Sequence, residues 1–175
     1  MRKLAICFIC FGFSLILGEH SDAQVAPITE DSLYYISYAD PINNAQINFN
    51  GKRDEPTSHG KYGDPDYMYA ELYQSVFGDL NGDHVTDAFV ILGFNYGGSG
   101  MAITGYAVLG SQDKPTATKP LLFGDRAQLN SIKIVSGKII IDAILAGPDD
   151  PSCCPSMKRI LTYHVKNGKL VGSKI

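Results

Sequence analysis

Two pairs of alternating apolar segments, each joined by a short turn that contains glycine, constrain the fold of this chain more than any other feature. The turns and their flanking segments are Ser136-Gly137 between residues 132–135 and 138–142, and Asn167-Gly168 between residues 160–165 and 170–171. Successive side chains of a strand point to opposite faces, and glycine supplies the backbone geometry of a tight turn. The pattern therefore predicts two antiparallel hairpins.

The rest of the chain is also richer in strand signals than in helix signals. Further strands are predicted at residues 33–38, 46–50, 69–76, 88–94 and 101–109, of which 88–94 is a continuous apolar run typical of a buried strand. Residues 51–67 and 111–119 are polar and are expected to be loops. We predict a mainly β domain of seven or eight strands, as an antiparallel sandwich or half-barrel built from hairpins. The alternative is an α+β fold with one short helix.

The N-terminus has the pattern of a secretory signal peptide. Arg2 and Lys3 precede an apolar stretch, Leu4 to Gly18, which at 15 residues is shorter than the roughly 20 residues of a membrane span. Ser21 and Ala23 place small residues at the third and first positions before Gln24, so we expect cleavage after Ala23, with an uncleaved anchor as the alternative. The expected organisation is a signal peptide at 1–23, an extended lead-in at 24–32 and one β-rich domain at 33–175. The expected location is periplasmic or secreted.

Length and charge exclude some classes of partner. Removing 23 of the 175 residues leaves 152, and the net charge stays at −3 because the removed basic and acidic residues cancel. A mildly acidic chain lacks the basic footprint of a nucleic-acid binder. No later apolar run reaches membrane length, so we expect no membrane span in the mature chain, which should be a monomer with an unidentified envelope partner.

Residues 79–87, Asp-Leu-Asn-Gly-Asp-His-Val-Thr-Asp, have the spacing of a loop that folds around a hard cation. Asp79, Asn81, Asp83 and Asp87 occupy positions 1, 3, 5 and 9, and the carbonyl of Val85 offers a further oxygen. An all-oxygen ligand set favours Ca²⁺ over zinc. The sequence therefore predicts a calcium site with these five residues as ligands.

Two departures from an EF-hand loop predict weak affinity. His84 stands at position 6, where EF-hands carry glycine, and Val90 stands at position 12, where they carry a bidentate acid. The alternative is an ion-free turn, in which the same Asp and Asn side chains accept hydrogen bonds from their own backbone amides.

Two other motifs carry chemistry. Cys153 and Cys154 are the two cysteines expected to remain after cleavage, and because they are adjacent we predict a vicinal disulfide that shapes a turn between prolines. A reduced pair and a redox or metal site are the alternatives. Asp125 and Arg126 are predicted to form an internal ion pair, with anion binding by Arg126 as the alternative.

Residues 77–87 resemble the FG-GAP-type calcium loop of integrin-like propellers, although one copy argues against a propeller. Four blocks occur in one order: Gly78–Asp83 with Asp87-Ala88, Gly97–Gly100, Gly124–Arg126 and Gly147–Pro155. Together they resemble uncharacterised exported bacterial proteins related to the LppP/LprE-type lipoproteins, over about residues 70–172. The resemblance implies an envelope location and carries no activity.

We therefore expect an exported, non-catalytic structural or binding module with one calcium-type loop. One alternative is an envelope hydrolase that uses Asp83, His84, Asp125 or Arg126, which would require these side chains to converge. Another is an inhibitor or accessory protein that docks through residues 51–67.

Overall fold

The structure is a computed structural model that describes residues 27–43, 45–53, 57–111, 114–173 and 175. Within these ranges the chain forms one four-residue helix and twelve strands, and every strand pair is antiparallel. The mainly β class predicted from the sequence is confirmed. The predicted signal peptide and residues 24–26 of the lead-in lie outside the described residues.

The elements follow one another with short connections. In chain order they are α1 (Glu30–Leu33), β1 (Ser37–Ala39), β2 (Gln46–Asn48), β3 (Thr57–His59), β4 (Met68–Gly78), β5 (Asp87–Asn95), β6 (Ala102–Leu109), β7 (Thr116–Ala117), β8 (Leu121–Asp125), β9 (Gln128–Val135), β10 (Lys138–Leu145), β11 (Met157–Lys166) and β12 (Lys169–Gly172).

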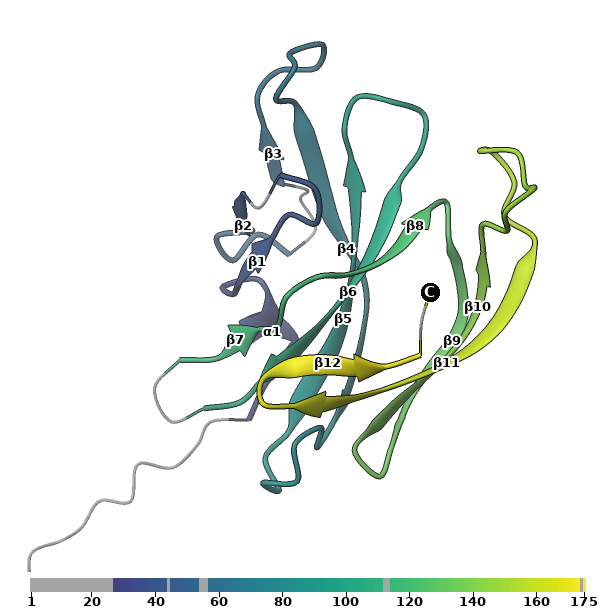
Figure 1. Ribbon diagram of the computed structural model, residues 1–175. Helices are drawn as coiled ribbons and strands as arrows, with labels where there is room; N and C mark the ends of the chain where they lie inside the picture. Colours follow the sequence, from purple (N-terminus) through teal and green to yellow (C-terminus); the bar gives the residue numbers. More distant parts are fainter. Residues whose placement is uncertain (1–26, 44, 54–56, 112–113, 174) are drawn as a thin grey trace, which may run out of the picture.

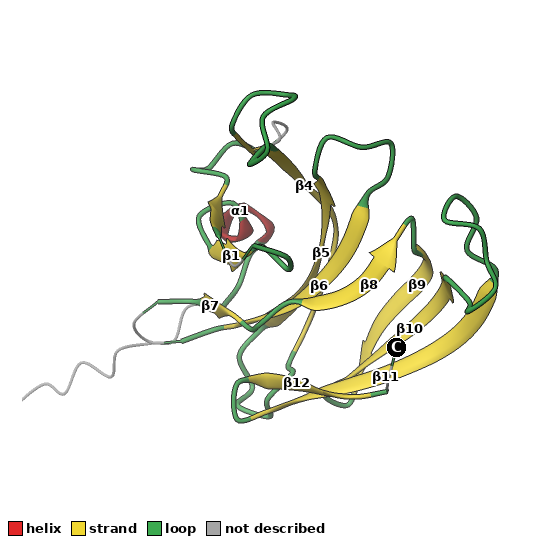
Figure 2. Ribbon diagram, turned by 45° about the horizontal axis from the view of Figure 1, so that its top comes forward, coloured by secondary structure: helices red, strands yellow, loops and turns green. Residues whose placement is uncertain are grey.

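The strands form three sheets, of which the central one lies between the other two (Figures 1 and 2). The central sheet has the order β3-β4-β5-β6-β7, and β8 pairs with another part of β6. The C-terminal sheet has the order β12-β11-β10-β9, and β1 pairs with β2 in a small N-terminal sheet. Both predicted turns are present, with left-handed φ angles of 49° and 72° at Ser136 and Gly137, and 51° and 67° at Asn167 and Gly168.

β5 separates two hydrophobic clusters. Ala88, Val90, Leu92 and Phe94 belong to a cluster shared with the N-terminal layer, which includes Leu33, Tyr38 and Phe49. Phe89 and Ile91 on the opposite face belong to a second cluster shared with the C-terminal sheet. Phe89, Phe94 and their neighbours on β5 are buried on both faces, in agreement with the continuous apolar run of the sequence.

The N-terminal part of the chain differs from the prediction. An extended lead-in was expected up to residue 32 and a strand at 33–38, but residues 30–33 are helical and the strand is confined to Ser37–Ala39. Thr29 and Ser32 form a reciprocal capping box, with the Ser32 amide donating to Thr29 Oγ1 at 3.3 Å. This local capping starts a helical turn whose Leu33 side chain is fully buried. The short helix leaves the class mainly β.

Two predicted loops contain strands. β3 lies within residues 51–67 and pairs with the start of β4, and β7 lies within residues 111–119 and pairs with the end of β6. The sequence also predicted seven or eight strands where the described residues form twelve. The strands outside the predicted ranges are β3, β7 and β8. β3 and β7 are short and polar, whereas β8 is a short apolar segment that contributes Phe123 to the core. Each is held by pairing with a neighbouring strand, which is a tertiary effect that periodicity does not report.

Gly105, on β6, tests the packing of the second hydrophobic cluster, which the central sheet shares with the C-terminal sheet. A Cβ at this position would lie 2.5 Å from Phe89 Cζ and 3.0 Å from Phe123 Cε2. We expect Gly105→Ala to lower the free energy of unfolding by about 1–3 kcal/mol, because both rings lie in a close-packed core. Urea denaturation measures the change. The matched control is Gly98→Ala, where the nearest atom would be 4.0 Å away, and equal stability of the two variants would contradict the packing described.

Candidate functional site

The predicted ion loop connects β4 to β5. Gly78 and Asp87 are paired neighbours at the ends of these strands, so the intervening residues must fold back on themselves. Gly82 and His84 both have left-handed backbone angles, with φ of 85° and 66°. Histidine at position 84 therefore adopts the geometry that glycine provides in an EF-hand loop.

Side chains inside the loop accept hydrogen bonds from its own backbone. The amides of Gly82 and Asn81 donate to Asp79 Oδ1 at 2.6 and 3.2 Å, and the amide of His84 donates to Asp79 Oδ2 at 3.0 Å. The amide of Val85 donates to Asp83 Oδ1 at 2.8 Å. These are the contacts expected of an ion-free turn.

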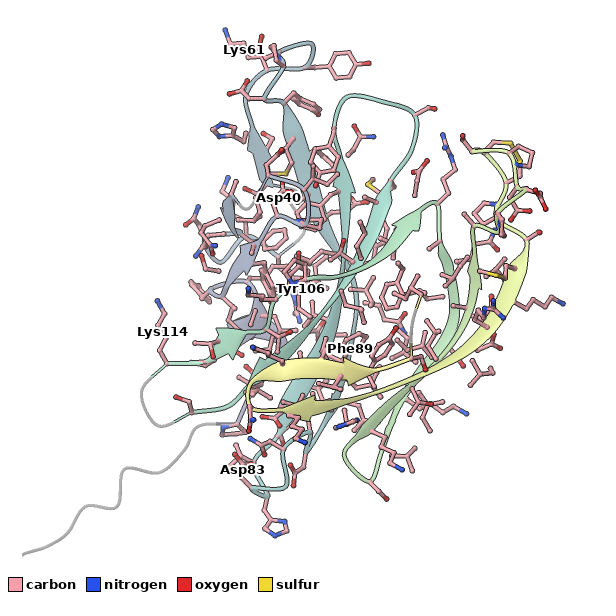
Figure 3. All side chains as sticks on the ribbon, in the orientation of Figure 1. Asp40, Lys61, Asp83, Phe89, Tyr106 and Lys114 are labelled. Carbon is pink, nitrogen blue, oxygen red and sulfur yellow. A yellow bond between two sulfur atoms is a disulfide. The ribbon has the colours of Figure 1, made fainter. Side chains whose placement is uncertain are left out.

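The same loop brings three carboxylates together. One oxygen each from Asp79, Asp83 and Asp87 lies within 4.8 Å of the other two. Asn81 is part of the group, because its Nδ2 donates to Asp83 Oδ2 at 2.8 Å and its Oδ1 accepts from the Asp83 amide at 3.0 Å. Val85, which was predicted to offer its carbonyl, contacts this group by donating its amide to Asp83 Oδ1. Figure 3 shows Asp83 on the loop at the lower end of the molecule.

This donor set fits a hard divalent cation. A carboxylate oxygen has two lone pairs, so an oxygen that accepts one hydrogen bond retains a lone pair for a metal. Asp79 Oδ2, Asp83 Oδ1 and Asp87 Oδ1 each accept one, whereas Asp79 Oδ1 accepts two. Three negative charges within such a distance repel one another, and a cation removes that repulsion. The internal hydrogen bonds therefore leave carboxylate oxygens free to contact a cation, and Asp79, Asp83 and Asp87 are the residues that could hold one.

Asp87 has a structural role that its spacing did not reveal. Its side chain is fully buried, and its Oδ2 and Oδ1 accept from the amides of Leu80 and Gly110, both at 2.9 Å. Leu80 lies in the loop and Gly110 directly follows β6, so one carboxylate joins the loop to two strands of the central sheet. Asp87 is thus both a candidate ligand and an anchor.

The two ends of the loop differ electrostatically. Hydrogen bonds from backbone amides, first that of Gly82, lower the pKa of Asp79. Burial raises the pKa of Asp87, and the nearby charges of Asp83 and Asp79 raise it further, against the two amide bonds that lower it. Burial and the neighbouring charges together outweigh the two amides, and a bound cation would counter both of these effects at Asp87.

A hollow lies between the loop and the β9–β10 turn. It has a volume of about 510 Å³ and is lined by Gly78, Asp79, Leu80, Asn81 and Gly82 on one side and by Ile134, Ser136 and Gly137 on the other. Asp79 and Asn81 therefore border this hollow, whereas Asp83 and Asp87 do not line it.

A second polar cluster forms at the opposite end of β5. The guanidinium of Arg126 donates to Asp125 Oδ2 at 2.6 Å, to the carbonyl of Ser152 at 3.2 Å and to Ser99 Oγ at 2.8 Å. Arg126 thereby joins its own block, Gly124–Arg126, to two others, through Ser99, which is 27 residues away, and Ser152, which is 26 residues away. The structure places Asp125 and Arg126 in an ion pair, so the guanidinium is occupied by protein acceptors.

The cysteine-proline block is part of this cluster. Cys153 and Cys154 are joined in a vicinal disulfide, and both residues are exposed. Asp150 orders the preceding turn by accepting from the amides of Gly147 and Ser156 at 2.8 and 2.7 Å and from Ser156 Oγ at 2.7 Å. These bonds, first that from Gly147, lower the pKa of Asp150.

The residues proposed for a hydrolase do not converge. β5 and β6 pair from Ala88 with Val108 to Phe94 with Ala102, and Ala102 in turn pairs with Asp125. Asp83 precedes the other end of β5, so the two groups are separated by roughly 20–25 Å of strand. The His84 side chain is 96% exposed at the loop surface. Asp83 and His84 therefore lie at one end of the central sheet and Asp125 and Arg126 at the other, so these four residues do not form one catalytic site.

Sequence reasoning missed Asp40, which is fully buried. Its Oδ1 accepts from the amides of Ile42 and Asn43 at 2.7 and 2.9 Å and from Tyr96 Oη at 2.8 Å, while Oδ2 has no partner among the described residues. Figure 3 shows Asp40 in the upper half of the molecule and Tyr106 below it, near the middle. The sequence did carry a signal for this turn, because Asp40 precedes Pro41 and a polar stretch, which is a common start of an Asx turn.

The chain was compared with known proteins. No protein-family model matches it, and no curated protein or solved structure is significantly similar to it. In the part of the chain that the structure describes, no helix has the length and apolarity of a membrane span.

Replacing Asp87 tests its role as an anchor. In Asp87→Asn one carboxylate oxygen is replaced by an amide NH₂. The backbone amide of either Leu80 or Gly110 then loses its acceptor, at a cost of about 1–3 kcal/mol. Relief of repulsion from the more exposed Asp79 and Asp83 offsets less than about 1 kcal/mol. We therefore expect a net loss in the free energy of unfolding of about 1–2 kcal/mol, measured by urea denaturation in EDTA. The control, Asp83→Asn, should lose less, and a larger loss there would contradict the assignment.

Replacing Arg126 tests the second cluster. Arg126→Lys keeps the charge, but a single ammonium cannot reproduce the forked contacts to Asp125, Ser152 and Ser99. We expect faster amide hydrogen exchange in both the Gly97–Gly100 and Gly147–Ser156 segments and a stability loss of about 1 kcal/mol. Arg159→Lys, at an exposed arginine, is the matched control. Unchanged exchange in both segments would show that Arg126 does not hold them together.

Proposed function

We propose that this protein is an exported, non-catalytic module of the cell envelope that binds one Ca²⁺ at the Asp79–Asp87 loop. The observation that carries the proposal is the approach of Asp79, Asp83 and Asp87 to within 4.8 Å of one another. Export is supported by the basic residues and apolar stretch of residues 2–18. The absence of a converging catalytic group among the described candidate residues favours a structural or binding role over a reaction.

Asp79, Asp83 and Asp87 would hold the ion, with Asn81 and Val85 as the remaining predicted ligands. The ion supplies positive charge to a loop that carries three carboxylates and connects two strands of the central sheet. Because the loop lacks the bidentate acid of an EF-hand, we expect a Kd of roughly 10⁻⁴–10⁻³ M, which suits a calcium-containing extracellular medium. The principal consequence of binding is a more stable β4–β5 connection.

A calcium titration of the melting temperature tests the proposal. A ligand that binds only the folded state stabilises it by mass action, so about 10 mM CaCl₂ should add about 1.4–2.7 kcal/mol, or roughly 3–10 °C in Tm. Asp79→Ala and Asp83→Ala should abolish the shift. Asp149→Ala removes the same charge from an exposed residue outside the loop and should keep it.

Three outcomes would contradict the proposal. The wild-type Tm could stay constant in calcium, the shift could persist in both loop variants, or MgCl₂ could produce the same shift. Turnover of a defined substrate that disappears on one substitution would overturn the non-catalytic role.

A further inference from the structure

The outer face of the C-terminal sheet has an unusual composition. Residues of β9–β12 alternate between the second hydrophobic cluster and the opposite, outward side of the sheet. We call the outward side the lysine face, which comprises Gln128, Ser131, Lys133, Val135, Lys138, Ile140, Asp142, Ile144, Lys158, Ile160, Thr162, His164, Lys166, Lys169 and Val171. Figure 1 shows this sheet at the right of the molecule, with the N-terminal layer on the far side of the central sheet.

Positive charge is concentrated on this face. It carries five lysines and a single carboxylate, Asp142, whereas the whole chain has a net charge of −3. Asp142 Oδ1 accepts from Asn130 Nδ2 at 3.2 Å. None of the five lysines forms an ion pair with a residue that the structure describes. Their charges are therefore available to an external anion.

Exposed aliphatic side chains lie between the lysines. Ile160 is 67% exposed, Val135 51% and Val171 44%. The register places Val135 beside Lys138, and Ile140 beside Lys133. Ile144 lies opposite Lys158 on the neighbouring strand. Charge and apolar surface are thus mixed over the same area, and neither is confined to one edge.

The composition distinguishes between two kinds of anionic partner. Protein interfaces are enriched in arginine and depleted in lysine. The lysine face has five lysines and no arginine at its outward positions. Lysines near an anionic lipid surface are each favourable, and short aliphatic side chains between them can enter the headgroup region. The face therefore fits a lipid surface better than a folded acidic protein.

We propose that the lysine face is a peripheral docking surface for anionic phospholipid membranes. The lysines provide charge complementarity to the headgroups, and Ile160, Val135 and Val171 provide shallow apolar contact. This interaction is independent of the calcium loop, which lies at one end of the sandwich and is not part of the face.

Sedimentation with vesicles tests the proposal. The protein is mixed in EDTA with vesicles of phosphatidylcholine alone or with phosphatidylglycerol added, both as the full chain and from Gln24 onward. The shorter form separates the contribution of the face from that of the apolar N-terminal stretch. We expect binding to the anionic vesicles only, and weaker binding at higher salt because exposed charges are screened.

Two triple variants with the same loss of charge provide the comparison. Lys133→Gln, Lys138→Gln and Lys158→Gln together should weaken partitioning roughly 100-fold, while Lys61→Gln, Lys114→Gln and Lys119→Gln, at exposed lysines elsewhere, should leave it within about threefold of wild type. Ile160→Ser should weaken binding without changing the charge. Thermal melting establishes that each variant folds.

Other outcomes overturn the proposal. Equal weakening by the two triple variants would mean that net charge, and not this face, drives binding. Absence of vesicle binding by the wild type, with retention on immobilised polyglutamate, would assign the face to an acidic polypeptide. Absence of both would make it an ordinary solvated sheet face.

Discussion

Burial of β5 on both of its faces is the constraint on which the rest of the structure depends. An antiparallel sheet commonly leaves one face in water, but eight of the nine residues of β5 are buried. Two separate covers are therefore required. The C-terminal sheet supplies one, and the N-terminal segment supplies the other through Leu33, Tyr38 and Phe49. Each fully buried side chain of this size contributes about 1.5–3 kcal/mol, so neither cover is dispensable.

The aromatic residues of the N-terminal layer explain how a short segment covers so much of the sheet. The rings of Tyr38 and Tyr106 meet edge to face with centroids 5.2 Å apart, and Tyr106 Oη donates to the carbonyl of Ala39 at 2.6 Å. Tyr38 Oη donates to the carbonyl of Leu33 at 2.9 Å. Burial raises the pKa of Tyr38 and of Tyr106, which keeps both phenols protonated and able to donate. These bonds satisfy polar atoms that the layer would otherwise bury unpaired.

The layered core leaves the ends of the sandwich and its outer surface for polar chemistry. Asp87 organises one end by accepting two buried backbone amides, and Arg126 organises the other by joining three loops. The two clusters have opposite requirements. Asp79, Asp83 and Asp87 bring three like charges together, whereas the guanidinium of Arg126 already has protein acceptors. This difference is why calcium binding is proposed at the first end and no ligand is proposed at the second.

The sequence by itself determined the β class, the turns at Ser136-Gly137 and Asn167-Gly168 and the grouping of Asp79, Asp83 and Asp87, because each depends on local residue pattern or on contacts between near neighbours. The continuous apolar run of β5 indicated that both faces of this strand must be covered, but not which segments cover them. Only the tertiary structure decided the burial of Asp87 against Gly110, the meeting of Ser99, Arg126 and Ser152, the paired state of β3 and β7, and the segregation of lysines onto one sheet face. These features depend on contacts between segments distant in sequence, which local periodicity and spacing do not encode.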